Sequence, residues 1–181
     1  MTFILCLAVA VTLVAAAIDL KRGEIPNWLT FGTFIAGVLA SAMLAGIRTA
    51  GDPLAIAYAT GGAIAGSAAC AVLPFLLWRS GVMGGGDVKL FIGLGALCHA
   101  AVGLDIELTA FIAGSLVAPV QLAFQGKLGV TMKRVGVLLW NLCVPKAYRR
   151  ELPQSEMTWY RFGPAIALAA VWVAWSRWGQ S

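Results

Sequence analysis

The feature that most constrains this chain is a series of apolar segments, each close to the length of a bilayer. A helix needs about 20 apolar residues, range about 17–25, to cross the hydrocarbon core. Only 12% of the residues are charged, about half the share in a soluble domain. We therefore expect an all-α, polytopic integral membrane protein with about six transmembrane helices in one domain, residues 1–181. The segments are Thr2–Ile18, Trp28–Ile47, Leu54–Trp78, Val88–Leu104, Leu108–Gln125 and Phe162–Trp178.

The distribution of basic residues predicts the orientation. No Lys or Arg precedes the first segment and Lys21-Arg22 follow it, the reverse of a signal peptide, so we expect a retained span with its N-terminus outside. Only Arg48 and Arg177 then face outward, which agrees with the positive-inside rule. The net charge of +5 is thus a topology signal, and we expect a lipid environment and no nucleic-acid partner. The inner basic residues are Lys21, Arg22, Arg79, Lys89, Lys127, Lys133, Arg134, Lys146, Arg149, Arg150 and Arg161.

The longest predicted inner connection is basic and amphipathic. Over about 127–144, apolar residues recur at three- and four-residue steps, with basic residues on another face. This pattern favours a helix on the inner leaflet, serving as a surface anchor or as a substrate-docking helix.

The chain has eight acidic residues, and two of them stand out. Asp19 ends the first segment and Asp87 begins the fourth, with two predicted spans between them, so both must face the same side of the membrane. An acid at the edge of the hydrocarbon is a functional hypothesis by default. Glu24 lies near Asp19 and is a weaker candidate. The remaining acids fall in predicted loops and are expected to be solvated: Asp52, Asp105, Glu107, Glu151 and Glu156.

Two carboxyl groups held at one depth suggest an aspartyl dyad. Because like charges cannot both ionise easily, one group keeps a proton and polarises a scissile carbonyl, while the other activates water. A serine or cysteine triad lacks a base, since the only histidine, His99, is expected near the outer end of the fourth span. No metal or other cofactor is expected, because the four cysteines form no C-x-x-C pair. The alternative is structural: Asp87 as a helix N-cap and Asp19 as a partner of a neighbouring base.

Three glycines precede Asp87. Gly84, Gly85 and Gly86 lack a Cβ, so they can take positive φ and permit close backbone approach. We expect them to help an extended peptide lie beside Asp87, as a strand-like edge does.

Three segments carry a resemblance to a known family. The run Gly84-Gly85-Gly86-Asp87-Val88-Lys89-Leu90 resembles the GxGD motif of type IV prepilin peptidases. Asp19, followed shortly by Ile25-Pro26-Asn27, is similar to the family's other aspartate segment, and Phe162-Gly163-Pro164-Ala165 is similar to the opening of its last span.

The resemblance implies cleavage of a short leader from type IV prepilins at the cytoplasmic face of a bacterial inner membrane. Asp19 and Asp87 match the catalytic aspartates, and Gly84, Gly85, Gly86 and Lys89 match the motif around them. Larger members add a zinc-binding N-terminal domain and also methylate the product; we expect no such domain here, and whether the chain methylates its product stays open. The size is similar to the peptidases of Flp (Tad) pilus systems. Two alternatives stay open: an archaeal-type preflagellin peptidase, and a non-enzymatic assembly or transport subunit.

Overall fold

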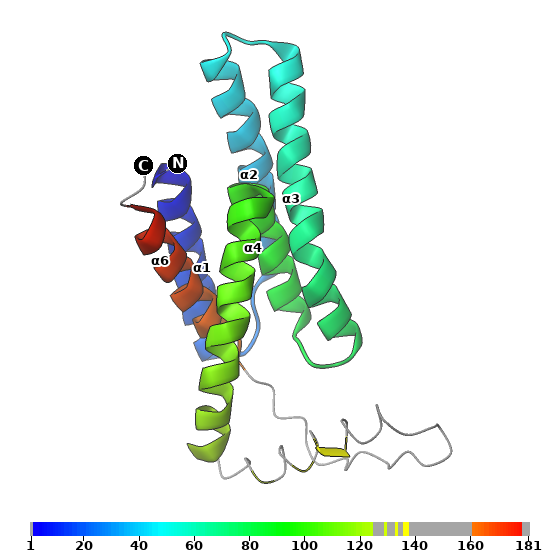
Figure 1. The fold of residues 1–181 in the computed structure, drawn as a ribbon, viewed down its shortest axis with the longest axis vertical. Helices are drawn as coiled ribbons and strands as arrows, with labels where there is room; N and C mark the ends of the chain where they lie inside the picture. Colours follow the sequence, from blue (N-terminus) through cyan, green and yellow to red (C-terminus); the bar gives the residue numbers. More distant parts are fainter. Residues whose placement is uncertain (1, 125–128, 130–132, 134–135, 138–160, 179–181) are drawn as a thin grey trace, which may run out of the picture. The chain divides into compact units, whose positions relative to one another are not determined.

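The described part of the chain is helical. The computed structural model describes residues 2–124, 129, 133, 136, 137 and 161–178. Most of the expected amphipathic segment, 127–144, lies outside these residues. Residues 1–113 and 161–181 form one compact unit, which contains both Asp19 and Asp87, and residues 114–160 form another. The helices are α1 (Thr2–Arg22), α2 (Asn27–Arg48), α3 (Pro53–Arg79), α4 (Gly85–Phe124) and α6 (Gly163–Trp178) (Figure 1).

Four helices in the described residues are long and apolar enough to cross a membrane. They are Phe3–Arg22 in α1, Asn27–Arg48, Pro53–Arg79 and Gly85–Val117 in α4. The protein is therefore a multi-pass, all-helical membrane protein, as predicted. The expected number of about six spans is not confirmed, because two of the predicted spans belong to α4, and α6 has only 16 residues.

Local signals in the sequence explain where the helices end. Gly23, at φ 72°, terminates α1, and its N–H donates to the carbonyl of Asp19 at 2.8 Å. The Asp52 side chain accepts a hydrogen bond from the Leu54 N–H at 3.1 Å, and Pro53 fills the first position of α3. Short connections then make α1, α2 and α3 alternate in direction (Figure 1). We call the end of the bundle where α1 ends and α2, α4 and α6 begin the Asp19 end.

Helix α4 reverses direction at His99. In a straight helix Phe91 and Phe111 would be about 30 Å apart, yet their ring centroids are 5.9 Å apart. The turn residue, His99, has φ 60° and ψ 172° and divides α4 into two antiparallel arms. The first arm, 85–98, is about 21 Å long, which is shorter than a hydrocarbon core of about 30 Å.

The predicted turn between Leu104 and Leu108 is therefore wrong. The charges of Asp105 and Glu107 indicated a loop, but both residues lie in the helical second arm of α4. No glycine or proline marks the true reversal at His99, so composition gave no signal for it.

The first arm of α4 lies at the centre of the bundle. Leu90, Phe91 and Leu94 are fully buried. Helices α2 and α3 approach this arm closely through glycines. A Cβ on Gly37 would lie 2.5 Å from the backbone nitrogen of Leu97, and one on Gly66 would overlap the carbonyl oxygen of Gly95. Small residues allow this backbone contact, which is a common way of packing membrane helices.

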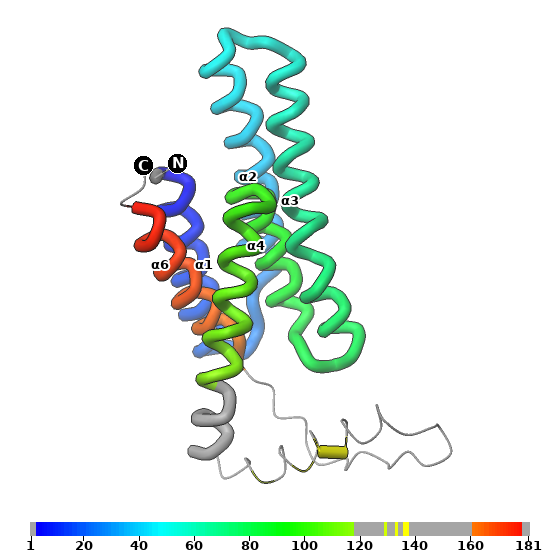
Figure 2. The backbone as a smooth tube through the Cα atoms, viewed as in Figure 1, coloured from blue at the N-terminus to red at the C-terminus, as the bar shows by residue number. Residues whose placement is uncertain are grey.

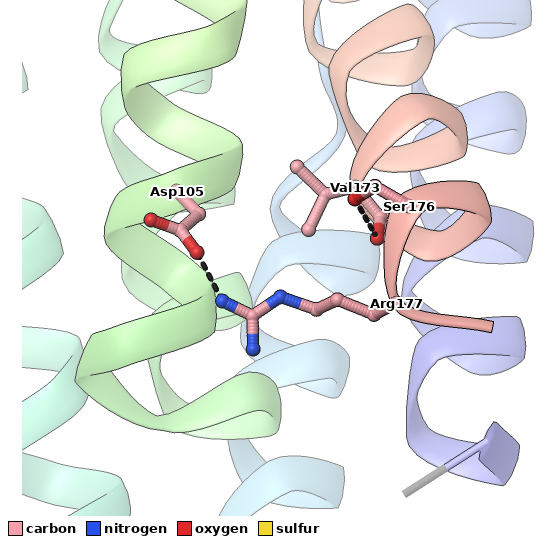
Figure 3. Close-up of polar contacts among 4 residues, drawn as sticks. All are labelled: Asp105, Val173, Ser176 and Arg177. Carbon is pink, nitrogen blue, oxygen red and sulfur yellow. Dashed lines mark hydrogen bonds and ion pairs between the residues drawn. The ribbon is translucent and has the colours of Figure 1, made fainter. Parts of the chain in front are cut away.

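Helices α1 and α6 pair on the other side of α4 (Figure 2). The buried residues of these two helices include small ones, such as Ala8, Ala15 and Ala169. Far from the Asp19 end, Arg177 of α6 forms an ion pair with Asp105 of α4 (Figure 3). This contact joins the α1–α6 pair to the second arm of α4.

Candidate active site

Asp19 lies in the last turn of α1 and is only 6% exposed. Its Oδ2 accepts a hydrogen bond of 3.1 Å from the backbone N–H of Gly163, the first residue of α6. The carboxyl group is thus held where α1 and α6 meet. Because it points inward, it does not act simply as a solvated partner of Lys21 or Arg22, which are both exposed.

Asp87 is the third residue of α4 and is 8% exposed. It is not an N-cap, because α4 already begins at Gly85. Its carboxyl group is hydrogen-bonded to the backbone of Gly84, the arrangement in which an acidic residue of the first turn reaches back to the residue before the helix. This bond fixes the carboxyl group at the helix entrance, and an acid there also suits the helix dipole.

The structure brings Asp19 and Asp87 together. The two carboxyl groups come from different helices, are both buried, and are close enough to interact electrostatically. The prediction that they share one end of the bundle is therefore met, because α2 and α3 separate them as expected. Two carboxyl groups that interact in this way resist ionising together, so one can keep its proton while the other activates a water molecule.

The glycine run provides space rather than unusual backbone angles. Gly85 and Gly86 are helical, and none of the three glycines has a positive φ, so a strand-like edge is not formed. A Cβ on Gly86 would lie 3.2 Å from the Cβ of Ile25, and one on Gly84 would lie 3.2 Å from the Asp87 carboxylate. The glycine run therefore allows neighbouring atoms to approach closely, which was the other part of what we expected from it.

Lys89 joins the two motif segments. Its Nζ donates a hydrogen bond of 2.8 Å to the Oδ1 of Asn27, the first residue of α2. Ile25, two residues earlier, is buried against Gly86. Through these two contacts the Ile25-Pro26-Asn27 turn packs against the first two turns of α4, next to Asp87.

Arg161, just before α6, and Gly163, its first residue, belong to the site, and sequence reasoning gave them no role. Besides the Gly163 amide on Asp19, the guanidinium of Arg161 donates to the carbonyl of Leu20 and interacts electrostatically with Asp19. Phe162 between them packs on Phe91 and Phe111, with ring centroids 6.3 and 5.5 Å away. The Arg-Phe-Gly-Pro sequence opening an apolar segment was the signal that could have indicated these contacts.

The other acidic residues of the described region lie apart from this pair. Glu24 is exposed, Asp52 caps α3 and Asp105 pairs with Arg177. Glu107 was expected to be solvated, and that is wrong: it is 3% exposed and its side chain is hydrogen-bonded to Cys70 of α3. The reversal at His99 carries it into the bundle. Within the described residues, no cluster of His, Cys, Asp and Glu could hold a metal ion.

The fold and the site together define a multi-pass membrane protein with a buried carboxyl pair at one end of its helices. A scan against protein-family models matches residues 6–119 to the Type IV leader peptidase family. This match covers more than half of the chain and includes Asp19 and Asp87, so the chain belongs to the type IV leader peptidase family. Membership confirms the family resemblance and implies a prepilin-type peptidase, a protease. Searches of curated proteins and of solved structures found no match.

Proposed function

We propose that the protein is an aspartyl endopeptidase that removes the leader from type IV prepilins of the Flp type at the cytoplasmic face of a bacterial inner membrane. The observation that carries the proposal is the meeting of Asp19 and Asp87. Both are buried, they come from separate helices, and they interact electrostatically. The Flp type rests on the resemblance of the sequence to the peptidases of Flp (Tad) pilus systems.

The mechanism needs only the two carboxyl groups and water. The ionised member accepts a proton from a water molecule, whose oxygen attacks the carbonyl carbon of the scissile peptide bond. The protonated member donates a hydrogen bond to the carbonyl oxygen as negative charge develops there. As the tetrahedral intermediate collapses and the C–N bond breaks, the carboxyl group that took the proton from water passes it to the leaving amine. The Gly163 amide and the Gly84 backbone orient the carboxyl groups throughout.

The charge distribution of the described residues supports a cytoplasmic site. Arg48 and Arg177 lie at the end of the bundle opposite Asp19. The positive-inside rule places the more basic end in the cytoplasm. The basic residues at the Asp19 end are Lys21, Arg22, Arg79, Lys89 and Arg161.

The proposal is tested by cleavage of a candidate Flp prepilin by the purified full-length protein in lipid nanodiscs. Asp19→Asn and Asp87→Asn should each lower the cleavage rate by about 10²–10⁴-fold, the range of general acid–base catalysis, while the protein stays inserted. Glu24→Gln is the matched control, because Glu24 is exposed in the loop after α1 and should tolerate the change. Cleavage close to wild type in either Asp variant would contradict the dyad.

A further inference from the structure

A cavity lies in the half of the bundle away from the Asp pair. Its volume is about 370 Å³, and its lining includes Leu5 of α1, Ser41, Ala45 and Arg48 of α2, and Leu97 and His99 of α4. Helix α2 starts beside Lys89 at the Asp19 end. Ser41 and Arg48 follow Asn27 by about 21 and 32 Å of helix. The cavity is therefore separate from the proposed active site, and the peptidase mechanism makes no use of it.

His99 has a backbone conformation that is unfavourable for any residue with a side chain. A φ of 60° with ψ of 172° is a region that glycine occupies freely and that other residues seldom adopt. A glycine would reverse α4 with less strain, yet the chain places its only histidine here. The His99 Nε2 and the Ser41 Oγ share a hydrogen bond of 3.1 Å. On the ring's other side, a Cβ on Gly62 of α3 would lie 3.1 Å from Nδ1. The imidazole is thus fixed between α2 and α3 at the cavity wall.

The lining combines an apolar interior with one cation at its edge. Apart from the Ser41–His99 pair, the residues along the wall are aliphatic, except for Cys98 and the exposed Arg48. None of the lining residues is acidic. The volume falls within the range of ligand sites, roughly 300–1,000 Å³. A ligand with an apolar chain and an anionic head group fits this arrangement. The head group can pair with the Arg48 guanidinium, while the chain displaces water from the interior of the cavity.

We propose that this cavity is a binding site for an anionic phospholipid, with an acyl chain between α1, α2 and α4 and the phosphate on Arg48. The Ser41–His99 pair supplies the hydrogen-bonding group inside the cavity, about 10 Å of helix from Arg48. Arg48 ends α2, so its guanidinium is placed at the level of lipid head groups.

The test is native mass spectrometry of the purified full-length protein, with dioleoyl phosphatidylglycerol, dioleoyl phosphatidylcholine and oleate added separately. The wild type should retain one phosphatidylglycerol more strongly than phosphatidylcholine. Arg48→Gln should weaken its retention about tenfold, the effect of one charge-assisted contact. Ala45→Trp should abolish retention by filling the cavity without altering charge. Arg177→Gln is the control, because it removes a cation from the same end but outside the lining.

His99→Gly separates binding from folding. The substitution removes the imidazole and relieves the backbone strain at residue 99. Lipid retention should therefore fall, while the melting temperature in detergent should not. Equal retention by wild type, Arg48→Gln and Ala45→Trp would overturn the proposal, as would equal retention of phosphatidylcholine. Preferential retention of oleate would assign the head group to a fatty-acid carboxylate and contradict the phospholipid.

Discussion

The substitution Gly163→Ala is the sharpest probe of the carboxyl pair, because it alters the position of Asp19 without altering its chemistry. A Cβ at residue 163 would lie 2.8 Å from the Asp19 Oδ2 and 3.0 Å from its Cβ. The closest ordinary van der Waals contact is 3.4 Å. The carboxylate must therefore retreat by about 0.6 Å, and α6 cannot move away instead, because Phe162 is anchored on Phe91 and Phe111.

The expected result is a loss of catalytic rate rather than of substrate binding. Misplacing a reacting group by about 1 Å can cost about 10²-fold in rate, so a shift of about 0.6 Å should lower kcat by about 10- to 100-fold. KM should change less, since the added methyl group contacts Asp19 and not the proposed peptide. Overpacking at this point should also cost about 1–3 kcal/mol of stability, which lowers the melting temperature by several degrees.

The assay is the initial rate of prepilin cleavage per folded protein in nanodiscs, with the melting temperature measured in parallel. Gly32→Ala in α2 is the matched control, because a Cβ there meets no atom within 4 Å and should leave both measurements near wild type. A Gly163→Ala rate within twofold of wild type, at equal folded protein, would refute the reasoning. It would mean that the Gly163 contact does not fix the reacting carboxyl group.

The same geometry predicts three other outcomes. Gly86→Val should sharply lower cleavage, because its side chain would press on Ile25 beside Asp87; Gly32→Val is the comparison, since a Cβ at residue 32 meets no atom within 4 Å. EDTA and phenanthroline should leave cleavage unchanged, and inhibition reversed by added metal would contradict a dyad that needs only water. In a cysteine-free background, Thr49→Cys should react with an impermeant maleimide in intact cells and Ser80→Cys only after permeabilisation; the opposite pattern would place the Asp19 end outside.

The sequence was sufficient to pair Asp19 with Asp87. Their shared side depends only on the two spans between them, α2 and α3, and both are long apolar runs bounded by clear turn signals such as Gly23 and Asp52-Pro53. Periodicity and charge identify such runs without knowledge of packing. The family segments around the aspartates likewise fall where the helices begin and end.

The sequence was not sufficient where packing overrides local signals. His99 turns the chain although a histidine is a poor residue for that backbone conformation, and Glu107 is buried although its charge indicated a loop. The Gly163 amide on Asp19 joins residues 144 positions apart, which no local pattern reveals. The orientation in the membrane and the chemistry of the pair stay predictions.

The unequal lengths of the helices have a consequence for the lipid around them. Helix α3 has 27 residues and α6 has 16, so their axial lengths are about 40 and 24 Å. In a bilayer core of about 30 Å the long helix must tilt, and α6 can cross the core only where the lipid beside it thins. Since α6 begins at the Asp19 carboxylate, that hydrophobic mismatch draws the aqueous interface toward the carboxyl pair. It shortens the distance that hydrolytic water must travel into the protein.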